Sequence, residues 1–153
     1  MSNNRLSRLE SPAVQGYISM LQGIINRMAG NSASCKTWTV TLVAALLALL
    51  VGKQIQIYIL LICLILVVLL LFVLDCYYLG LERITIGIQK DFLKSLSKDS
   101  EEEYINQLYD VSKLANKKLQ KDKAKEAMRS LSTLPFYSFV ALIALIVLIL
   151  NCI

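Results

Sequence analysis

Three long runs of uncharged residues divide this chain, and they limit its fold more than any other feature. The first covers residues 37–52 between Lys36 and Lys53, the second 54–74 and the third 134–153. A helix rises about 1.5 Å per residue and a hydrocarbon core is about 30 Å thick, so the second and third runs are long enough to cross it. The first run is shorter and crosses only if its flanking lysines snorkel. The sequence therefore predicts an all-α membrane protein with three transmembrane helices.

Composition excludes several classes of function. Hydrophobic residues make up 56% of the chain and the mean hydropathy is +0.59, above the roughly 45–50% apolar usage of soluble domains. The chain has no histidine, which excludes a histidine zinc ligand, a Ser-His-Asp triad and a histidine general base. Its four cysteines form no CxxC pair. We expect no enzyme, no metal and no cofactor.

The distribution of lysine and arginine predicts the orientation. Residues 1–36 carry four of these residues, the turn between the first two spans carries only Lys53, and residues 76–133 carry eleven. Because positive charge accumulates on the cytoplasmic side, the N-terminus and the middle segment are expected there, in a bacterial inner membrane, with the C-terminus outside. The alternative for the first span is a cleaved signal peptide.

An amphipathic helix is predicted over residues 12–29, within an N-terminal cytoplasmic segment 1–35. It begins at Ser11-Pro12, with serine as cap and proline in the first turn, and is expected to end near Gly30-Asn31. Its apolar residues recur at helical spacing, and its polar face is nearly uncharged. The helix could lie on the membrane or on other cytoplasmic helices, or it could dock a protein or a second copy.

Segment 76–133 is predicted to form a cytoplasmic helical hairpin after the transmembrane hairpin 36–75 (spans at about 37–52 and 54–74). The first helix continues out of the second span with an apolar stripe: Tyr77, Leu81, Ile84, Ile88, Phe92 and Leu96. A capping box, Ser100-x-x-Glu103, opens a second helix expected to run to about Leu131. This hairpin can bury only a small core alone, so it is expected to pack on the N-terminal helix or on another copy.

A basic cluster lies in the second of these helices. It includes Lys117, Lys118, Lys121, Lys125 and Arg129. Such a cluster serves as a topology signal that also attracts anionic lipids, or as a site for an anionic ligand such as a nucleotide second messenger. Nucleic acid is not expected as a partner, because no aromatic residues are interleaved with the basic ones.

The first span differs from the others because small residues gather on one side of it: Thr37, Thr41, Ala44, Ala48 and Gly52. Such a face lets helices approach closely. It could pack within the monomer, or between subunits with the threonines near a pore mouth above a hydrophobic gate. No Asp, Glu, Lys, Arg or His lies inside a span, so ion-coupled transport is not expected.

Four motifs resemble a known family over about residues 10–95. They are Ser11-Pro-Ala-Val-Gln, Leu21-Gln-x-Ile-Ile-x-Arg-Met-Ala-x-Asn-Ser, Cys35-Lys-Thr-Trp-x-Val-Thr-Leu-Val and Asp75-x-Tyr-Tyr-Leu-x-Leu-Glu. Together with the layout, they resemble the SLATT-type bacterial membrane effectors. The resemblance implies pore formation or membrane disruption in an anti-phage system, often beside a nucleotide-producing sensor. A third span is not part of the family's plain two-span pattern.

The sequence thus leads to a first hypothesis and two alternatives. The first hypothesis is an oligomeric membrane-permeabilising effector, gated through its cytoplasmic helices by a sensor protein or a nucleotide second messenger. The alternatives are a non-conducting membrane adaptor for a soluble partner and a holin-like protein.

Overall fold

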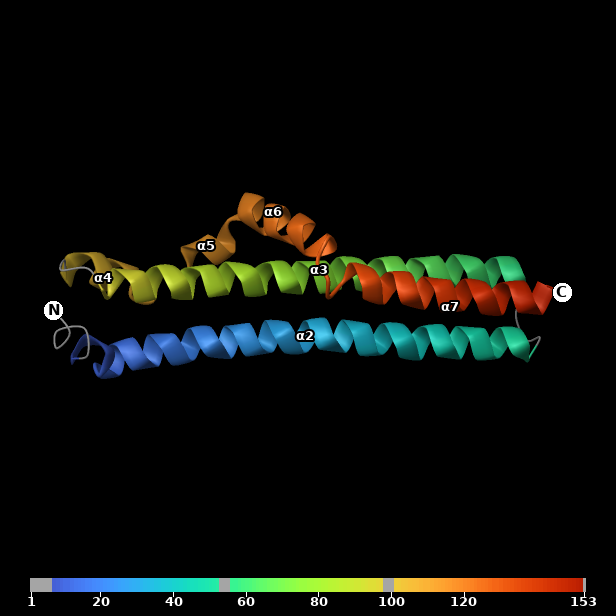
Figure 1. The fold of residues 1–153 in the computed structure, drawn as a ribbon, viewed down its shortest axis with the longest axis horizontal. Coiled ribbons are helices and arrows are strands. Elements are labelled where there is room, and N and C mark those ends of the chain that lie inside the picture. Colours follow the sequence, from blue (N-terminus) through green and yellow to red (C-terminus); the bar gives the residue numbers. More distant parts are fainter. Residues whose placement is uncertain (1–6, 53–55, 98–100, 153) are drawn as a thin grey trace.

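Two long antiparallel helices form a rod, and the remaining helices lie along it (Figure 1). The computed structural model describes residues 7–52, 56–97 and 101–152. These residues are helical or in connections and contain no strand, which confirms the predicted all-α fold. The helices are α2 (Pro12–Val51), α3 (Ile57–Ser95), α4 (Glu101–Gln107), α5 (Ser112–Ala115), α6 (Lys117–Met128) and α7 (Leu134–Cys152).

The rod has an apolar half and a polar half. The apolar half consists of residues 37–52, residues 56–74 and helix α7. The polar half consists of the other described residues: the first part of α2, the last part of α3, and α4, α5 and α6 with their connections. Large hydrophobic side chains face outward throughout the apolar half, over far more surface than a soluble monomer exposes. Helices α2 and α3 are long and apolar enough to cross a membrane, and α7 is a shorter apolar helix.

The prediction that the N-terminal helix ends near Gly30-Asn31 is wrong, because α2 continues through these residues. Helix α2 begins at Pro12 as expected but runs for 40 residues to Val51, straight into the first apolar run. Leu21 before the expected break and Cys35 after it are both buried. The packing of α2 on α3 therefore continues through Gly30, and it outweighs the cost of about 1 kcal/mol for a glycine in a helix.

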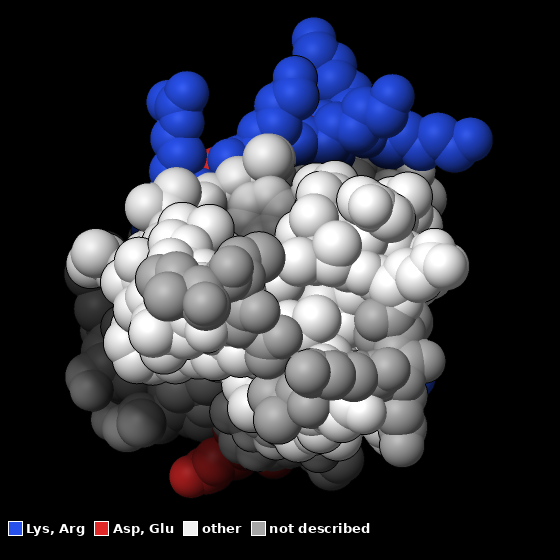
Figure 2. Space-filling view, turned by 90° about the vertical axis from the view of Figure 1, so that its right-hand side faces the viewer, with Lys and Arg blue, Asp and Glu red and all other residues white. Residues whose placement is uncertain are grey.

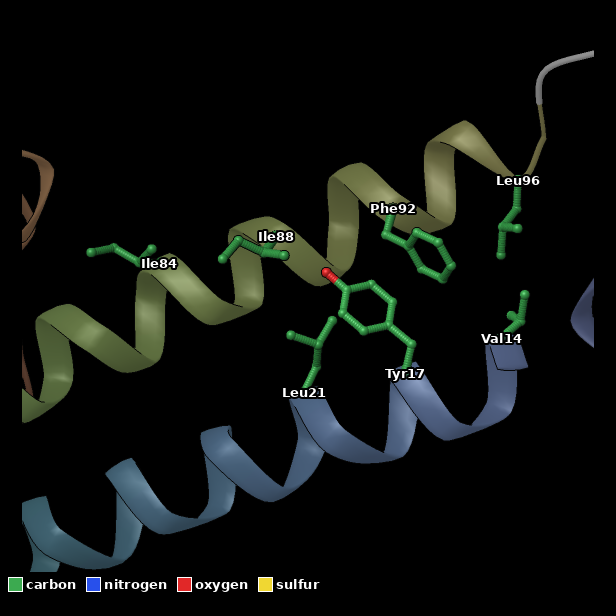
Figure 3. Close-up of a cluster of buried hydrophobic side chains, with 7 residues drawn as sticks. All are labelled: Val14, Tyr17, Leu21, Ile84, Ile88, Phe92 and Leu96. Atoms are coloured by element: carbon green, nitrogen blue, oxygen red, sulfur yellow. The ribbon is translucent and has the colours of Figure 1, made fainter. Parts of the chain in front are cut away.

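A small core holds the polar half together (Figure 3). Tyr17 of α2 is its centre, and its ring meets the ring of Phe92 edge-on, with 4.7 Å between centroids. The other buried members come from the two predicted apolar stripes: Val14, Leu21, Ile84, Ile88 and Leu96. The middle segment thus packs on the N-terminal helix, one of the two partners predicted for it.

The single helix predicted from the capping box to about Leu131 is wrong, because the structure breaks it into α4, α5 and α6. Tyr109 adopts a left-handed conformation with φ 62°, and the Asn116 side chain caps α6 by accepting from the backbone N–H of Lys118 and Leu119. The Tyr109 hydroxyl donates to the Ala13 carbonyl oxygen at 3.4 Å. Tertiary contacts with α2 thus accompany the break. Ser100 lies outside the described residues.

Gly80 sets how closely α6 lies on α3. A Cβ at this position would be only 2.9 Å from the backbone nitrogen of Ala124 in α6, whereas a Cβ at Gly87, two turns further along α3, would meet nothing within 4 Å. The two backbones therefore touch at Gly80, and only a residue without a side chain fits there.

Gly80→Ala is accordingly expected to lift α6 from α3, at a cost of about 1–3 kcal/mol for the overpacked contact. Hydrogen–deuterium exchange should become faster over residues 117–128. The matched control Gly87→Ala should leave this exchange unchanged and stabilise α3 by about 1 kcal/mol. If the two variants exchange alike in α6, the close contact at Gly80 is not what holds that helix.

Candidate functional site

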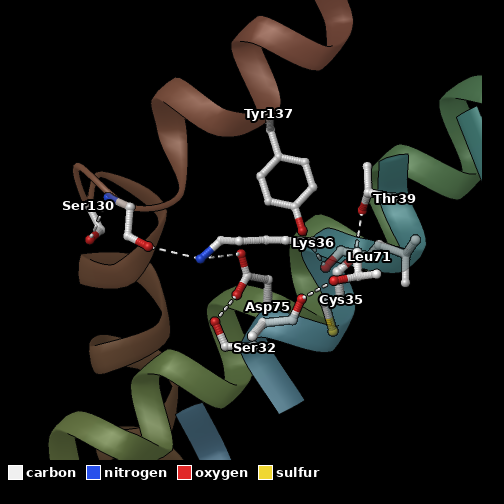
Figure 4. A network of polar contacts seen from close by, with 11 residues as sticks. Ser32, Cys35, Lys36, Thr39, Leu71, Asp75, Ser130 and Tyr137 are labelled. Carbon is white, nitrogen blue, oxygen red and sulfur yellow. Dashed lines mark hydrogen bonds and ion pairs between the residues drawn. The ribbon is translucent and has the colours of Figure 1, made fainter. Parts of the chain in front are cut away.

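A buried ion pair lies where the polar and apolar halves meet (Figure 4). The Asp75 side chain, from α3, is 0% exposed, and the Lys36 Nζ atom of α2 lies 3.6 Å from its Oδ2 atom. Ser32, one turn before Lys36, donates a hydrogen bond from Oγ to Asp75 Oδ1 at 2.5 Å. Two residues of the neighbouring helix thus hold the carboxylate.

The same cluster ties the start of α7 to the rod. Lys36 Nζ donates to Ser132 Oγ, in the connection between α6 and α7, at 2.8 Å. One turn into α7, the Tyr137 hydroxyl donates to the Leu71 carbonyl oxygen of α3 at 3.2 Å. Segments distant in sequence therefore meet at one level, and we name Ser32, Lys36, Asp75, Ser132 and Tyr137 the boundary cluster.

Sequence reasoning missed this cluster because it treated Lys36 only as a snorkelling charge and did not pair it with Asp75. A signal was present, because Lys36 directly precedes the first apolar run and Asp75, of opposite sign, directly follows the second. In a tight antiparallel hairpin, Lys36 lies about as far before the turn as Asp75 lies after it. The two charges are then level, and opposite charges at one level in an apolar setting form a pair.

The small-residue face of α2 lies outside the packing of its own chain. Thr37, Thr41, Ala44, Ala48 and Gly52 are all exposed. The opposite face of α2 packs instead on α3 and α7, in a cluster that includes Val43, Leu50, Leu60, Leu64, Val140, Ala144 and Leu148. The Thr37 and Thr41 hydroxyls donate to carbonyl oxygens one turn earlier in α2. Their donors are thus satisfied within the helix.

The basic cluster lies on α6 and its C-cap, and four of its five members line two adjoining grooves. Lys117, Lys121 and Lys125 line a groove of about 470 Å³ between α3 and α6, and Arg129 lines the next groove toward α7. Lys118 is exposed and lines neither groove. Figure 2 shows basic side chains gathered on one side of the molecule, the side on which α6 lies in Figure 1.

A cavity of about 370 Å³ in the polar half lies against Tyr17, and Asp91, Glu103 and Asp110 also line it. The hydrogen bond from Lys113 lowers the pKa of Asp91, and a hydrogen bond from the backbone N–H of Ser112 lowers that of Asp110. Both groups therefore stay ionised near neutral pH. Lys94 and Lys113 line the same cavity, so its charged lining is mixed rather than purely acidic.

Across residues 7–52, 56–97 and 101–152, no three potential metal-ligating side chains (His, Cys, Asp or Glu) are grouped to hold a metal ion. The candidate sites are therefore the basic groove, the exposed face of α2 and the boundary cluster that joins the two halves. No family model, curated protein or solved structure matches this chain.

Proposed function

We propose that α2, α3 and α7 cross a membrane together, with the polar half in the cytoplasm. Exposed aromatic residues support this placement, because Tyr58 at the start of α3 is 70% exposed and Tyr77 is 41% exposed. A rise of about 1.5 Å per residue puts roughly 28 Å between them, close to the thickness of a hydrocarbon core. Aromatic side chains favour both interfaces of a bilayer, and Tyr77 lines the same groove as Lys117, Lys121 and Lys125 of α6.

Within this placement, we propose an oligomeric membrane-permeabilising protein whose subunits meet through α2. The observation that carries the proposal is the exposure of the whole small-residue face, from Thr37 to Gly52. In lipid, small residues promote association because they let two helices approach and pack closely. Since α3 and α7 cover only the opposite face, the small-residue face is free to meet another copy.

The long helices provide a route for control from the cytoplasm. Helices α2 and α3 each run without interruption from the polar half into the apolar half, and the Lys36–Asp75 pair fixes one against the other. A partner that shifts the Tyr17 core would therefore move both spans as rigid elements. The SLATT-like motifs agree with an effector role in bacterial defence.

Ala48→Leu is expected to abolish both the oligomer and the permeability, because its larger side chain blocks close approach of two α2 helices. The measurement is inducible expression in bacteria, with membrane potential and impermeant-dye entry followed beside chemical cross-linking of membranes. Wild type should depolarise the cells and cross-link as an oligomer, whereas the variant should do neither. Thr41→Leu, on the same face, should behave like Ala48→Leu.

Ala141→Leu is the matched control, because Ala141 is also exposed in the apolar half but belongs to α7. It should cross-link and depolarise as wild type does. Unchanged oligomer size and depolarisation in Ala48→Leu would contradict the proposed subunit contact. An oligomer that never depolarises the membrane would favour the adaptor.

A further inference from the structure

The groove between α3 and α6 combines an apolar floor with a basic rim. Phe72, Val73 and Met128 contribute apolar surface, and Lys117, Lys121 and Lys125 line it from α6. The three lysines recur every four residues, so they follow one face of the helix and point to the same side. An apolar slot with charges of one sign along one edge is suited to an amphiphile.

The groove is continuous with the apolar half of the rod. Phe72 and Val73 belong to the second apolar run. The adjoining groove, of about 610 Å³, shares Phe72, Lys125 and Met128 and reaches Leu134, where α7 begins. An acyl chain lying in the groove would therefore leave it directly into the hydrocarbon region proposed above.

Within the part of the chain that the structure describes, the charge of the rim has no ion-pair partner. Among the described residues, none of the three lysines lies within ion-pair distance of a carboxylate. Glu126, on the same helix, is held by Lys123 at 2.7 Å and by Arg83 at 3.4 Å. The three ammonium groups are thus available to an anion from outside the chain.

We propose that this groove binds one anionic phospholipid, with an acyl chain on Phe72, Val73 and Met128 and the phosphate on Lys117, Lys121 and Lys125. The proposal rests on the membrane placement of the chain but not on pore formation. It differs from general attraction to an anionic surface in requiring both parts of the lipid. A bound lipid would join α6 to α3 beside the close contact at Gly80.

Native mass spectrometry of the full chain released from detergent micelles tests the proposal, with phosphatidylglycerol and phosphatidylcholine of identical acyl chains as probes. Wild type should retain one phosphatidylglycerol and no phosphatidylcholine. The double substitution Lys121→Gln and Lys125→Gln should weaken retention about 30-fold, since each basic residue contributes about 1 kcal/mol to binding of anionic lipid. Val73→Trp should also abolish retention by filling the groove while leaving every charge in place.

The control with equal loss of charge is Lys90→Gln with Lys94→Gln, because these exposed residues of α3 do not line the groove. It should retain lipid as wild type does. Retention lost equally in this control, or kept in Val73→Trp, would reduce the binding to unspecific attraction and overturn the proposal. Ala48→Leu should keep the lipid, so a failure of pore formation is separable from a failure of lipid binding.

Discussion

Lys36→Met is expected to destabilise the chain by about 3 kcal/mol, because it leaves the Asp75 carboxylate buried without its positive partner. Asp75 Oδ2 accepts no hydrogen bond, so Lys36, at 3.6 Å, is the compensating group the structure provides for it. The Lys36 side chain is 21% exposed, which places the expected loss at the lower end of the range for broken buried pairs. Thermal unfolding in detergent, followed by circular dichroism, measures the loss.

Lys113→Met is the matched control, because it breaks an ion pair that is shorter but exposed. Lys113 Nζ lies 2.7 Å from Asp91 Oδ2, with both side chains more than half exposed. Water solvates the Asp91 carboxylate once Lys113 is gone, so the expected loss of stability is below about 1 kcal/mol. The longer pair should therefore matter more than the shorter one, since burial rather than distance decides the energy.

Combining Lys36→Met with Asp75→Leu should recover most of the stability, because no charge is then left in the apolar setting. Two results would contradict this account of the boundary cluster. One is a loss in Lys36→Met no larger than in Lys113→Met, and the other is a double variant as unstable as Lys36→Met alone.

Structural features that depend on the residue pattern within a single segment could be predicted from the sequence. The apolar runs predicted the helical apolar half, and the apolar spacing around Tyr17 and Phe92 predicted the two faces that form the polar core. The exposed face of α2 was identified as a candidate contact face because its small residues repeat at helical spacing. Each of these signals lies within one helix, where periodicity alone determines which residues share a face.

Features that depend on two distant stretches could not be predicted in the same way. Gly30 is an ordinary stop signal, and only the pairing of α2 with α3 on both sides of it keeps the helix intact. The break at Tyr109 accompanies a hydrogen bond to Ala13 in α2, which no local propensity contains. The close contact of α6 with α3 requires that Gly80 has no side chain. Nothing in the residues around Gly80 indicates that another helix lies against it.

Tyr17→Ala is expected to separate α2 from α3 in the polar half, at a cost of about 3–5 kcal/mol for a large buried aromatic side chain. Tyr17 is 0% exposed, and besides Phe92 its ring meets the ring of Tyr109 with 5.4 Å between centroids. Hydrogen–deuterium exchange should become faster over residues 12–25 and 84–96 together. Protection retained in either range would mean that Tyr17 is not the centre of this core.

Tyr17→Phe separates the packing of the Tyr17 ring from the hydrogen bond of its hydroxyl. The ring remains and only the hydroxyl is lost, which donates to the Asp110 carbonyl oxygen at 2.8 Å, so the expected cost is about 1 kcal/mol. Faster exchange should then be confined to the connection around residues 108–116, with α2 and α3 still protected. Burial, and to a smaller extent the charge of Asp110, raises the pKa of the Tyr17 hydroxyl. The hydrogen bond therefore contributes fully to stability below about pH 10, the ordinary tyrosine pKa, and its contribution is lost as the pH rises further and the hydroxyl ionises. The phenylalanine variant should lack that alkaline loss, which shows whether the connection is held by the hydroxyl or by the ring.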